Sequence, residues 1–131
     1  MVGAAATLRG RIAAMTTTGR VFELRTYHAT PGKLDALLAR FRDHTHRIFV
    51  RHGIEVVGYW VPVPADGAEA DTLVYVVVFD DDATRTAAWQ AFRDDAEWAS
   101  VRAESERVSG GPLVTGIDVV TLAPTNFSPL R

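Results

Sequence analysis

The sequence has no cysteine, which excludes disulfide bonds, thiolate catalysis and cysteine-bound metals. It also lacks an apolar run long enough to cross a bilayer, so we expect no membrane span. Neither sign of charge dominates, because the formal net charge is only −2, and we therefore expect no nucleic-acid partner. These absences fit a cytoplasmic protein, and the length of 131 residues suits one domain with one core.

The first 20 residues differ from the rest, since three alanines are soon followed by Arg9 and Arg11 without a periodic pattern. The apolar part is too short and too charged for a secretory signal, although its Arg-rich, acid-poor composition also suits an organelle-targeting peptide. We interpret residues 1–20 as a flexible N-terminal extension, with Met15 as an alternative start. Residues 21–131 are then the single domain.

Residues 21–53 predict a strand, a sharp turn and one long helix. Residues 21–27 show the period of two that is typical of a strand. Thr30 can cap the helix through its hydroxyl, Pro31 suits the first helical position, and Gly53 supplies the left-handed residue that ends it. The stripe facing the core consists of Leu34, Leu38, Phe41, Thr45, Ile48 and His52.

The histidines of this helix differ in their expected direction. At about 100° per residue, His44 falls on the edge of the apolar stripe and His52 falls within it. His46 points towards water. We therefore expect His44 and His52 to reach the interface between helix and sheet, either as functional groups or as partly buried histidines that have a hydrogen-bond partner.

The rest of the chain alternates further strands and helices. Asp80, Asp81 and Asp82 predict the start of a helix rather than a metal site, because carboxylates there cap free N–H groups. The expected elements are strands at 54–61, 72–79 and 113–122 and helices at 84–93 and 95–109. The order β-α-β-β-α-β predicts an α+β, ferredoxin-like fold with an antiparallel four-stranded sheet.

The strand at 72–79 is apolar on both of its faces. One layer of helices covers only one face of a four-stranded sheet. A second copy of the chain is the simplest cover for the other face, so we expect a homodimer whose sheets pack together.

Several segments resemble the NIPSNAP family, within the dimeric α/β-barrel superfamily. They are residues 22–27 (FELRTY), 31–33 (PGK), 51–53 (RHG), 87–92 (AAWQAF), 94–98 (DDAEW) and 124–129 (PTNFSP). Family members often have proline at the position of Ala96. The resemblance implies a dimeric barrel with a pocket between sheet and helices in each subunit, whereas the activities of superfamily relatives range from cofactor-free monooxygenases and isomerases to cyclases and haem-degrading enzymes.

Such a pocket would be lined by polar and aromatic residues of the strands and helices. We expect His44 to act as general acid or base, Arg25 to hold a carboxylate or enolate oxygen, and Tyr27 to donate to a developing negative charge. The residues expected to bind a small hydrophobic or aromatic molecule are Glu23, Tyr59, Trp60, Tyr75, Trp89 and Trp98. Alternatively, Glu23 and Arg25 neutralise each other, and the tryptophans belong to the core.

Two functions stay open from the sequence. One is an enzyme without metal or bound cofactor that performs proton transfer, cyclisation, isomerisation or oxygenation. The other is a non-catalytic ligand-binding or interaction module. We expect no metal site, because His44 and His46 diverge on a helix and cannot bind one ion together. Haem binding would depend on one axial ligand, His44 or His52, and a lone histidine is a weak signal for it.

Overall fold

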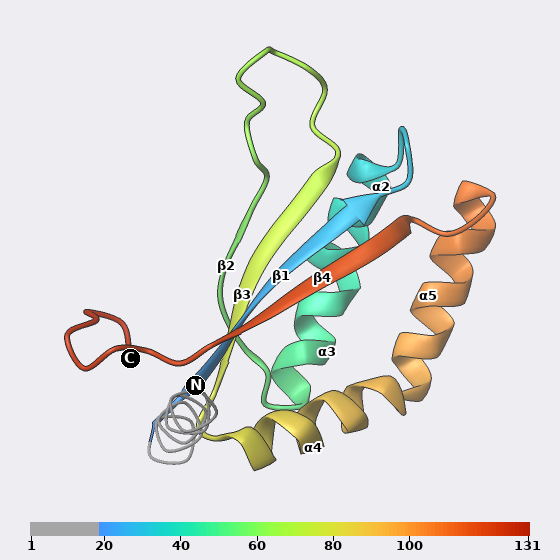
Figure 1. Ribbon diagram of the computed structural model, residues 1–131. Helices are drawn as coiled ribbons and strands as arrows, with labels where there is room; N and C mark the ends of the chain where they lie inside the picture. The colour runs from blue at the N-terminus through green and yellow to red at the C-terminus, as the bar shows by residue number, and fades with distance from the viewer. Residues whose placement is uncertain (1–18) are drawn as a thin grey trace, which may run out of the picture.

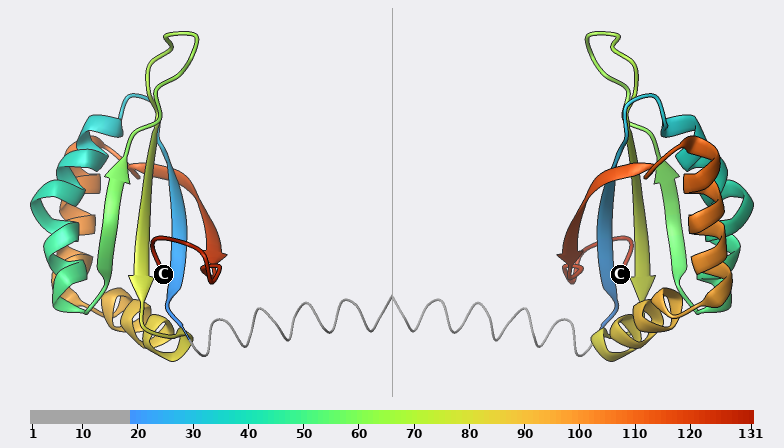
Figure 2. Two further views of the ribbon diagram at one scale, coloured as in Figure 1. Left: turned by 90° about the vertical axis from the view of Figure 1, so that its left-hand side faces the viewer. Right: turned by 90° about the vertical axis from the view of Figure 1, so that its right-hand side faces the viewer.

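A computed structural model describes residues 19–131, so most of the expected N-terminal extension lies outside the described residues. The described residues form one antiparallel sheet with strand order β2-β3-β1-β4. Helices cover one face of this sheet and leave the other bare (Figures 1 and 2). The elements are β1 (Val21–Ala29), α2 (Leu34–Arg40), the π-helical turn η1 (Phe41–Thr45), α3 (His46–Arg51), β2 (Glu55–Trp60), β3 (Thr72–Phe79), α4 (Asp82–Arg93), α5 (Ala96–Ser109) and β4 (Val114–Leu122).

This order confirms the ferredoxin-like α+β fold that the sequence predicts. The two central strands, β1 and β3, supply the middle of the core. Their residues pair so that the side chains facing the helices lie opposite one another. Glu23 lies opposite Val77 and Arg25 lies opposite Tyr75. Tyr75 and Val77 are fully buried under the helical layer.

Aspartates start two of the helices, as the sequence predicts. Asp81 caps α4 by accepting a hydrogen bond at 2.7 Å from the Thr84 N–H, and Asp95 caps α5 by accepting one at 3.0 Å from the Trp98 N–H. Gly110 ends α5 in the left-handed conformation, with φ of +83°. Asp95 thus starts α5 only two residues after Arg93 ends α4.

The start of the first helical segment differs from the prediction. Helix α2 begins at Leu34, and no side chain caps it. Thr30 does not cap the helix, because its hydroxyl donates instead to the Pro112 carbonyl at 2.6 Å. Gly53 does close the segment, as expected, with φ of +74°.

The long helix is also interrupted by the π-helical turn η1. A π turn contains more residues than an α turn, so every later residue is rotated back around the helix axis. His44 is exposed, with its Nδ1 3.4 Å from the Arg47 guanidinium. The expectation that His44 reaches the interface between helix and sheet is therefore wrong. His46 is exposed, as expected, and its Nδ1 lies 2.9 Å from the Tyr59 hydroxyl.

No helix among residues 19–131 is long and apolar enough to cross a membrane.

Candidate functional site

A pocket of about 250 Å³ lies between the sheet and the pair of helices α4 and α5. Its floor comes from β1 and β4, and its walls come from α4, α5 and the end of α2. The lining residues are Arg25, Tyr27, Arg40, Trp89, Phe92, Arg93, Trp98, Arg102, Glu106, Pro112, Val114 and Ile117. Of the nine residues that the sequence singles out, Arg25, Tyr27, Trp89 and Trp98 are brought together here.

The orientation of Arg25 is fixed by a buried carboxylate. The side chain of Glu23 is 3% exposed, and it accepts a hydrogen bond at 2.8 Å from Arg25 Nε. The second oxygen of Glu23 accepts one at 3.0 Å from the indole N–H of Trp89 and a longer one from Arg85. The Arg25 guanidinium lies over the Trp89 ring at 3.9 Å from its centroid. Glu23 therefore positions Arg25 and Trp89 from behind and does not line the pocket itself.

The charge of Arg25 is secured by its neighbours. Burial opposes the charged form, but Tyr75, Tyr27 and Glu23 together outweigh that effect and raise the pKa of Arg25. The guanidinium thus remains a permanent cation at the floor of the pocket. A fixed cation in a partly dry site interacts more strongly with a ligand than the same group in water.

A pair of tyrosine hydroxyls lies beside this cation. The Tyr75 hydroxyl donates to the Tyr27 hydroxyl at 2.9 Å, and Tyr75 is fully buried. Burial, together with the neighbouring Tyr27, raises the pKa of Tyr75 well above its usual value, so Tyr75 stays protonated. Because Tyr27 accepts from Tyr75, the proton of Tyr27 is directed away from Tyr75 and can be donated to a ligand.

Arg40 and Trp98 form the opposite wall. Arg40 is 6% exposed although it is charged, and its guanidinium lies 5.2 Å from the centroid of the Trp98 ring. Its Nη1 donates to the Ser105 hydroxyl at 3.2 Å. Trp98 also packs on Phe92, with ring centroids 4.8 Å apart. This wall therefore combines flat apolar surfaces with a buried positive charge.

The remaining sequence-predicted residues lie elsewhere. Tyr59 and His46 border a separate pocket near Phe41 and Leu73, and Trp60 lies on the bare face of the sheet, where it is 52% exposed. His44 lines a groove between α2 and α5, on the other side of Arg40 from the pocket. The catalytic role expected of His44 therefore stays a prediction that the pocket geometry does not use.

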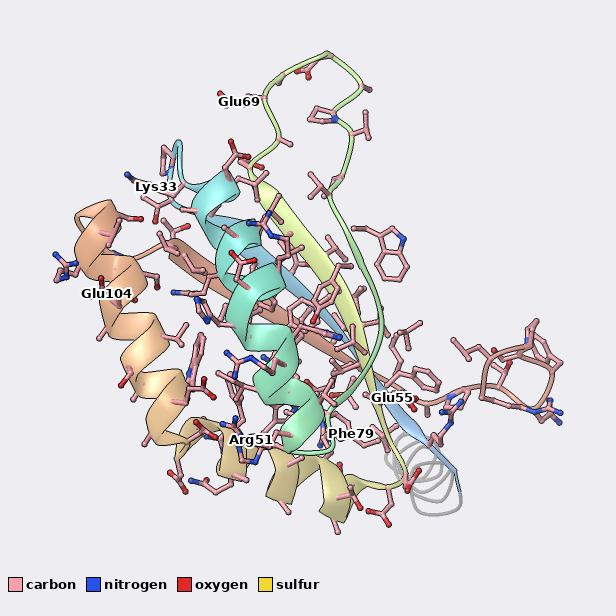
Figure 3. The ribbon with its side chains drawn as sticks, turned by 180° about the vertical axis from the view of Figure 1, so that it is seen from behind. Lys33, Arg51, Glu55, Glu69, Phe79 and Glu104 are labelled. Atoms are coloured by element: carbon pink, nitrogen blue, oxygen red, sulfur yellow. The ribbon has the colours of Figure 1, made fainter. Side chains whose placement is uncertain are left out.

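His52 has a structural partner at the end of α3. Its Nε2 lies 2.6 Å from the Asp95 carboxylate, which also binds Arg51. This pair joins the end of α3, where Arg51 is labelled in Figure 3, to the corner between α4 and α5. The His52 Nε2, which would have to coordinate a haem iron, is therefore already in contact with Asp95.

Sequence reasoning missed three of the four arginines in the pocket. Arg40 could have been found, because it follows Leu37 by one helical turn and so falls among apolar positions of α2. Arg93 and Arg102 gave no such signal, since both are exposed residues of amphipathic helices. Their convergence depends on the angle between α4 and α5.

The described residues contain no group of three or more histidines, aspartates or glutamates that could hold a metal ion. The polar groups of the pocket are guanidinium and hydroxyl groups together with Glu106. Guanidinium groups bind anions, so the chemistry of this lining suits a negatively charged or electron-rich organic molecule better than a cation.

Comparison with known proteins identifies the class to which this fold and pocket belong. The ferredoxin-like architecture is shared with a putative antibiotic biosynthesis monooxygenase from Caulobacter crescentus, with a TM-score of 0.55 at 11% identity over 86% of this chain and 96% of that one. It is closer to a NIPSNAP family protein of unknown function from Agrobacterium tumefaciens, with a TM-score of 0.72 at 24% identity over 87% and 96% of the two chains.

The sequence profile of the NIPSNAP family matches residues 22–129, and the chain therefore belongs to the NIPSNAP family. Among curated relatives, mouse NipSnap homolog 3B is 30% identical over 82 residues, which are 63% of this chain and 32% of that protein. The chain therefore matches about a third of the length of this relative.

Proposed function

We propose that this domain binds a small hydrophobic molecule with an aromatic or unsaturated ring in the pocket between β1, β4, α4 and α5. One observation carries the proposal: Trp89 and Trp98 line the same cavity as Arg25 and Tyr27. Aromatic walls with a few convergent polar groups are typical of small-molecule sites. The volume of about 250 Å³ suits a molecule of one or two rings.

Proton transfer without a metal or bound cofactor is the chemistry that this pocket favours if the domain is an enzyme. Tyr27 has a free hydroxyl proton, and Arg25 can stabilise an enolate or carboxylate oxygen beside it. The alternative is a binding module, in which the same groups only orient the ligand. Loss of turnover but not of binding in Tyr27→Phe would separate the two, since phenylalanine keeps the ring and removes the hydroxyl.

We also propose that the domain works as a homodimer that pairs the bare faces of two sheets. Trp60, Val120 and Leu122 are 52%, 51% and 41% exposed, and they lie on the face that no helix covers (Figure 2). An apolar surface of this kind on a sheet usually marks an interface between proteins.

The binding proposal is tested by following the three indole N–H signals in a nitrogen-15 NMR spectrum of the full chain. Flat aromatic compounds should shift the signals of Trp89 and Trp98, which line the pocket. Trp60 is the internal control, because it lies on the opposite face of the sheet. The proposal is wrong if no compound in an aromatic panel moves the Trp89 and Trp98 signals, or if only Trp60 responds.

A further inference from the structure

The pocket concentrates positive charge in a chain whose formal net charge is −2. Its described lining holds one acidic residue, Glu106, and four arginines: Arg25, Arg40, Arg93 and Arg102. Two of the arginines are matched locally, since Arg25 binds Glu23 and Arg102 lies 3.2 Å from Glu106. Arg93 reaches only a neutral partner, the Gln90 side chain, at 3.0 Å.

Arg40 is the buried arginine of this set that has no anionic partner. Its Nε is buried without a hydrogen-bond partner, and no carboxylate of the described residues lies within ion-pair distance of its guanidinium. Burial lowers the pKa of Arg40, with Glu106 opposing, but an arginine stays protonated in a protein. A buried cation without a counter-ion is destabilising, and an arriving anion removes that penalty.

We propose that the ligand of this pocket is a flat aromatic acid whose carboxylate binds the guanidinium of Arg40. This inference rests on the proposed function and names the ligand class for the same site. A planar carboxylate matches the fork of a guanidinium, and the aromatic part of the lining, which includes Trp89 and Trp98, suits a flat ring. Arg93 and Arg102 lie at the exposed rim, where they raise the local concentration of anions.

The size of the pocket limits the rest of the molecule. A cavity of about 250 Å³ is slightly below the usual range of about 300–1,000 Å³ for ligand sites. One or two fused rings and a carboxylate are therefore the expected scale, whereas a long acyl chain or a nucleotide is too large to be enclosed.

The test compares naphthoate with naphthylmethanol, which share a ring system and differ in charge. We expect calorimetry on the full chain at low salt to show naphthoate binding at least tenfold more tightly. This advantage should shrink as salt is added, because it arises from charge attraction. The indole signals of Trp89 and Trp98 report in parallel whether each probe enters the pocket.

Two arginine variants assign the effect to this lining. Arg40→Gln should weaken naphthoate binding at least tenfold and leave naphthylmethanol unchanged, with circular dichroism as the check on folding. Arg102→Gln should weaken naphthoate binding several-fold. This variant replaces Arg40→Gln as the test if Arg40→Gln does not fold, because Arg102 is exposed on α5 and its loss should not disturb the core. Its matched control is Arg107→Gln, which removes an exposed α5 arginine that pairs with Glu104 and lies outside the pocket.

The outcomes separate this inference from the proposed function. Equal affinity for the two probes, or equal effects of Arg102→Gln and Arg107→Gln on naphthoate, would overturn the acid ligand and leave the aromatic pocket standing. Unchanged naphthoate binding in a folded Arg40→Gln would overturn the role of Arg40. If neither probe moves the Trp89 and Trp98 signals, the pocket itself is not a binding site and the acid ligand is rejected with it.

Discussion

Glu23 fixes one wall of the pocket from behind without lining it. Its two oxygens hold Arg25, Arg85 and the indole of Trp89, which come from β1 and α4. The carboxylate is almost completely buried, so its charge is stable only because two guanidinium groups surround it. The wall of the pocket therefore depends on a residue that the pocket does not expose.

We predict that Glu23→Gln lowers the free energy of unfolding by about 3 kcal/mol, the lower end of what breaking a buried ion pair costs. Glutamine keeps the size of the side chain but leaves Arg25 and Arg85 without a counter-charge. Urea unfolding followed by tryptophan fluorescence measures the change. Glu104→Gln is the control, because Glu104 pairs with Arg107 on the exposed face of α5 and its loss should change stability far less.

A loss in Glu23→Gln no larger than in Glu104→Gln would show that the buried carboxylate contributes no more than an exposed one. The tryptophan signal serves a second purpose, since Trp89 loses a charged acceptor for its indole N–H in this variant.

The corner between α3 and α5 is held by charges gathered around Asp95. This residue caps α5, and its second oxygen lies 2.5 Å from Arg51 and 2.6 Å from His52. Glu97 extends the network by binding Arg47 and Arg51. The hydrogen bond from Arg51 and then that from His52 lower the pKa of Asp95 far below its usual value.

The depressed pKa makes the corner sensitive to acid. A carboxyl whose pKa is lower in the folded state stabilises the fold above its unfolded pKa of about 3.9, and this contribution is lost as the pH falls through the folded pKa. We predict that Asp95→Asn is less stable than wild type at neutral pH, because asparagine keeps the cap and loses the charge. The gap should close as the pH falls below about 4.

Chemical denaturation of both proteins between neutral pH and about pH 3 measures this difference in stability. Parallel curves over the whole range would contradict the assignment of the acid sensitivity to Asp95.

The elements were predictable where a local signal defines them. The strand at 72–79 and the aspartate starts of α4 and α5 match the sequence because branched residues and helix caps act over a few positions. The π turn η1 has no such local signature, and the exposed position of His44 within it was not predicted.

The candidate site was predictable only in part for the same physical reason. Arg25 and Tyr27 share one face of a strand, so the alternation of β1 places both of them together. Their meeting with Arg93 and Arg102 depends on packing between elements far apart in the chain, which no spacing in the sequence encodes.

At the scale of the whole molecule, the proposed homodimer rests on the bare face of the sheet. We predict that the wild-type chain is a dimer at micromolar concentration and that Val120→Asp makes it a monomer, because a charge on this face would be buried between two copies. Analytical ultracentrifugation measures both.

Val108→Asp is the matched control, since Val108 is 70% exposed on α5 and lies away from the sheet face. It should leave the dimer intact. A monomeric wild type, or a Val120→Asp variant that still dimerises like Val108→Asp, would contradict the predicted interface.

The strand order also governs when the fold can form during synthesis. One edge of β1 pairs with β3, but the other pairs with β4, where Phe22 lies opposite Leu122. Among the described strands, β1 is synthesised before β4, so one edge of β1 waits for β4 before its backbone groups are paired. During that interval β1 presents an open strand edge, which is the feature that promotes pairing with other chains. We therefore expect slow synthesis of the β4 segment to favour aggregation.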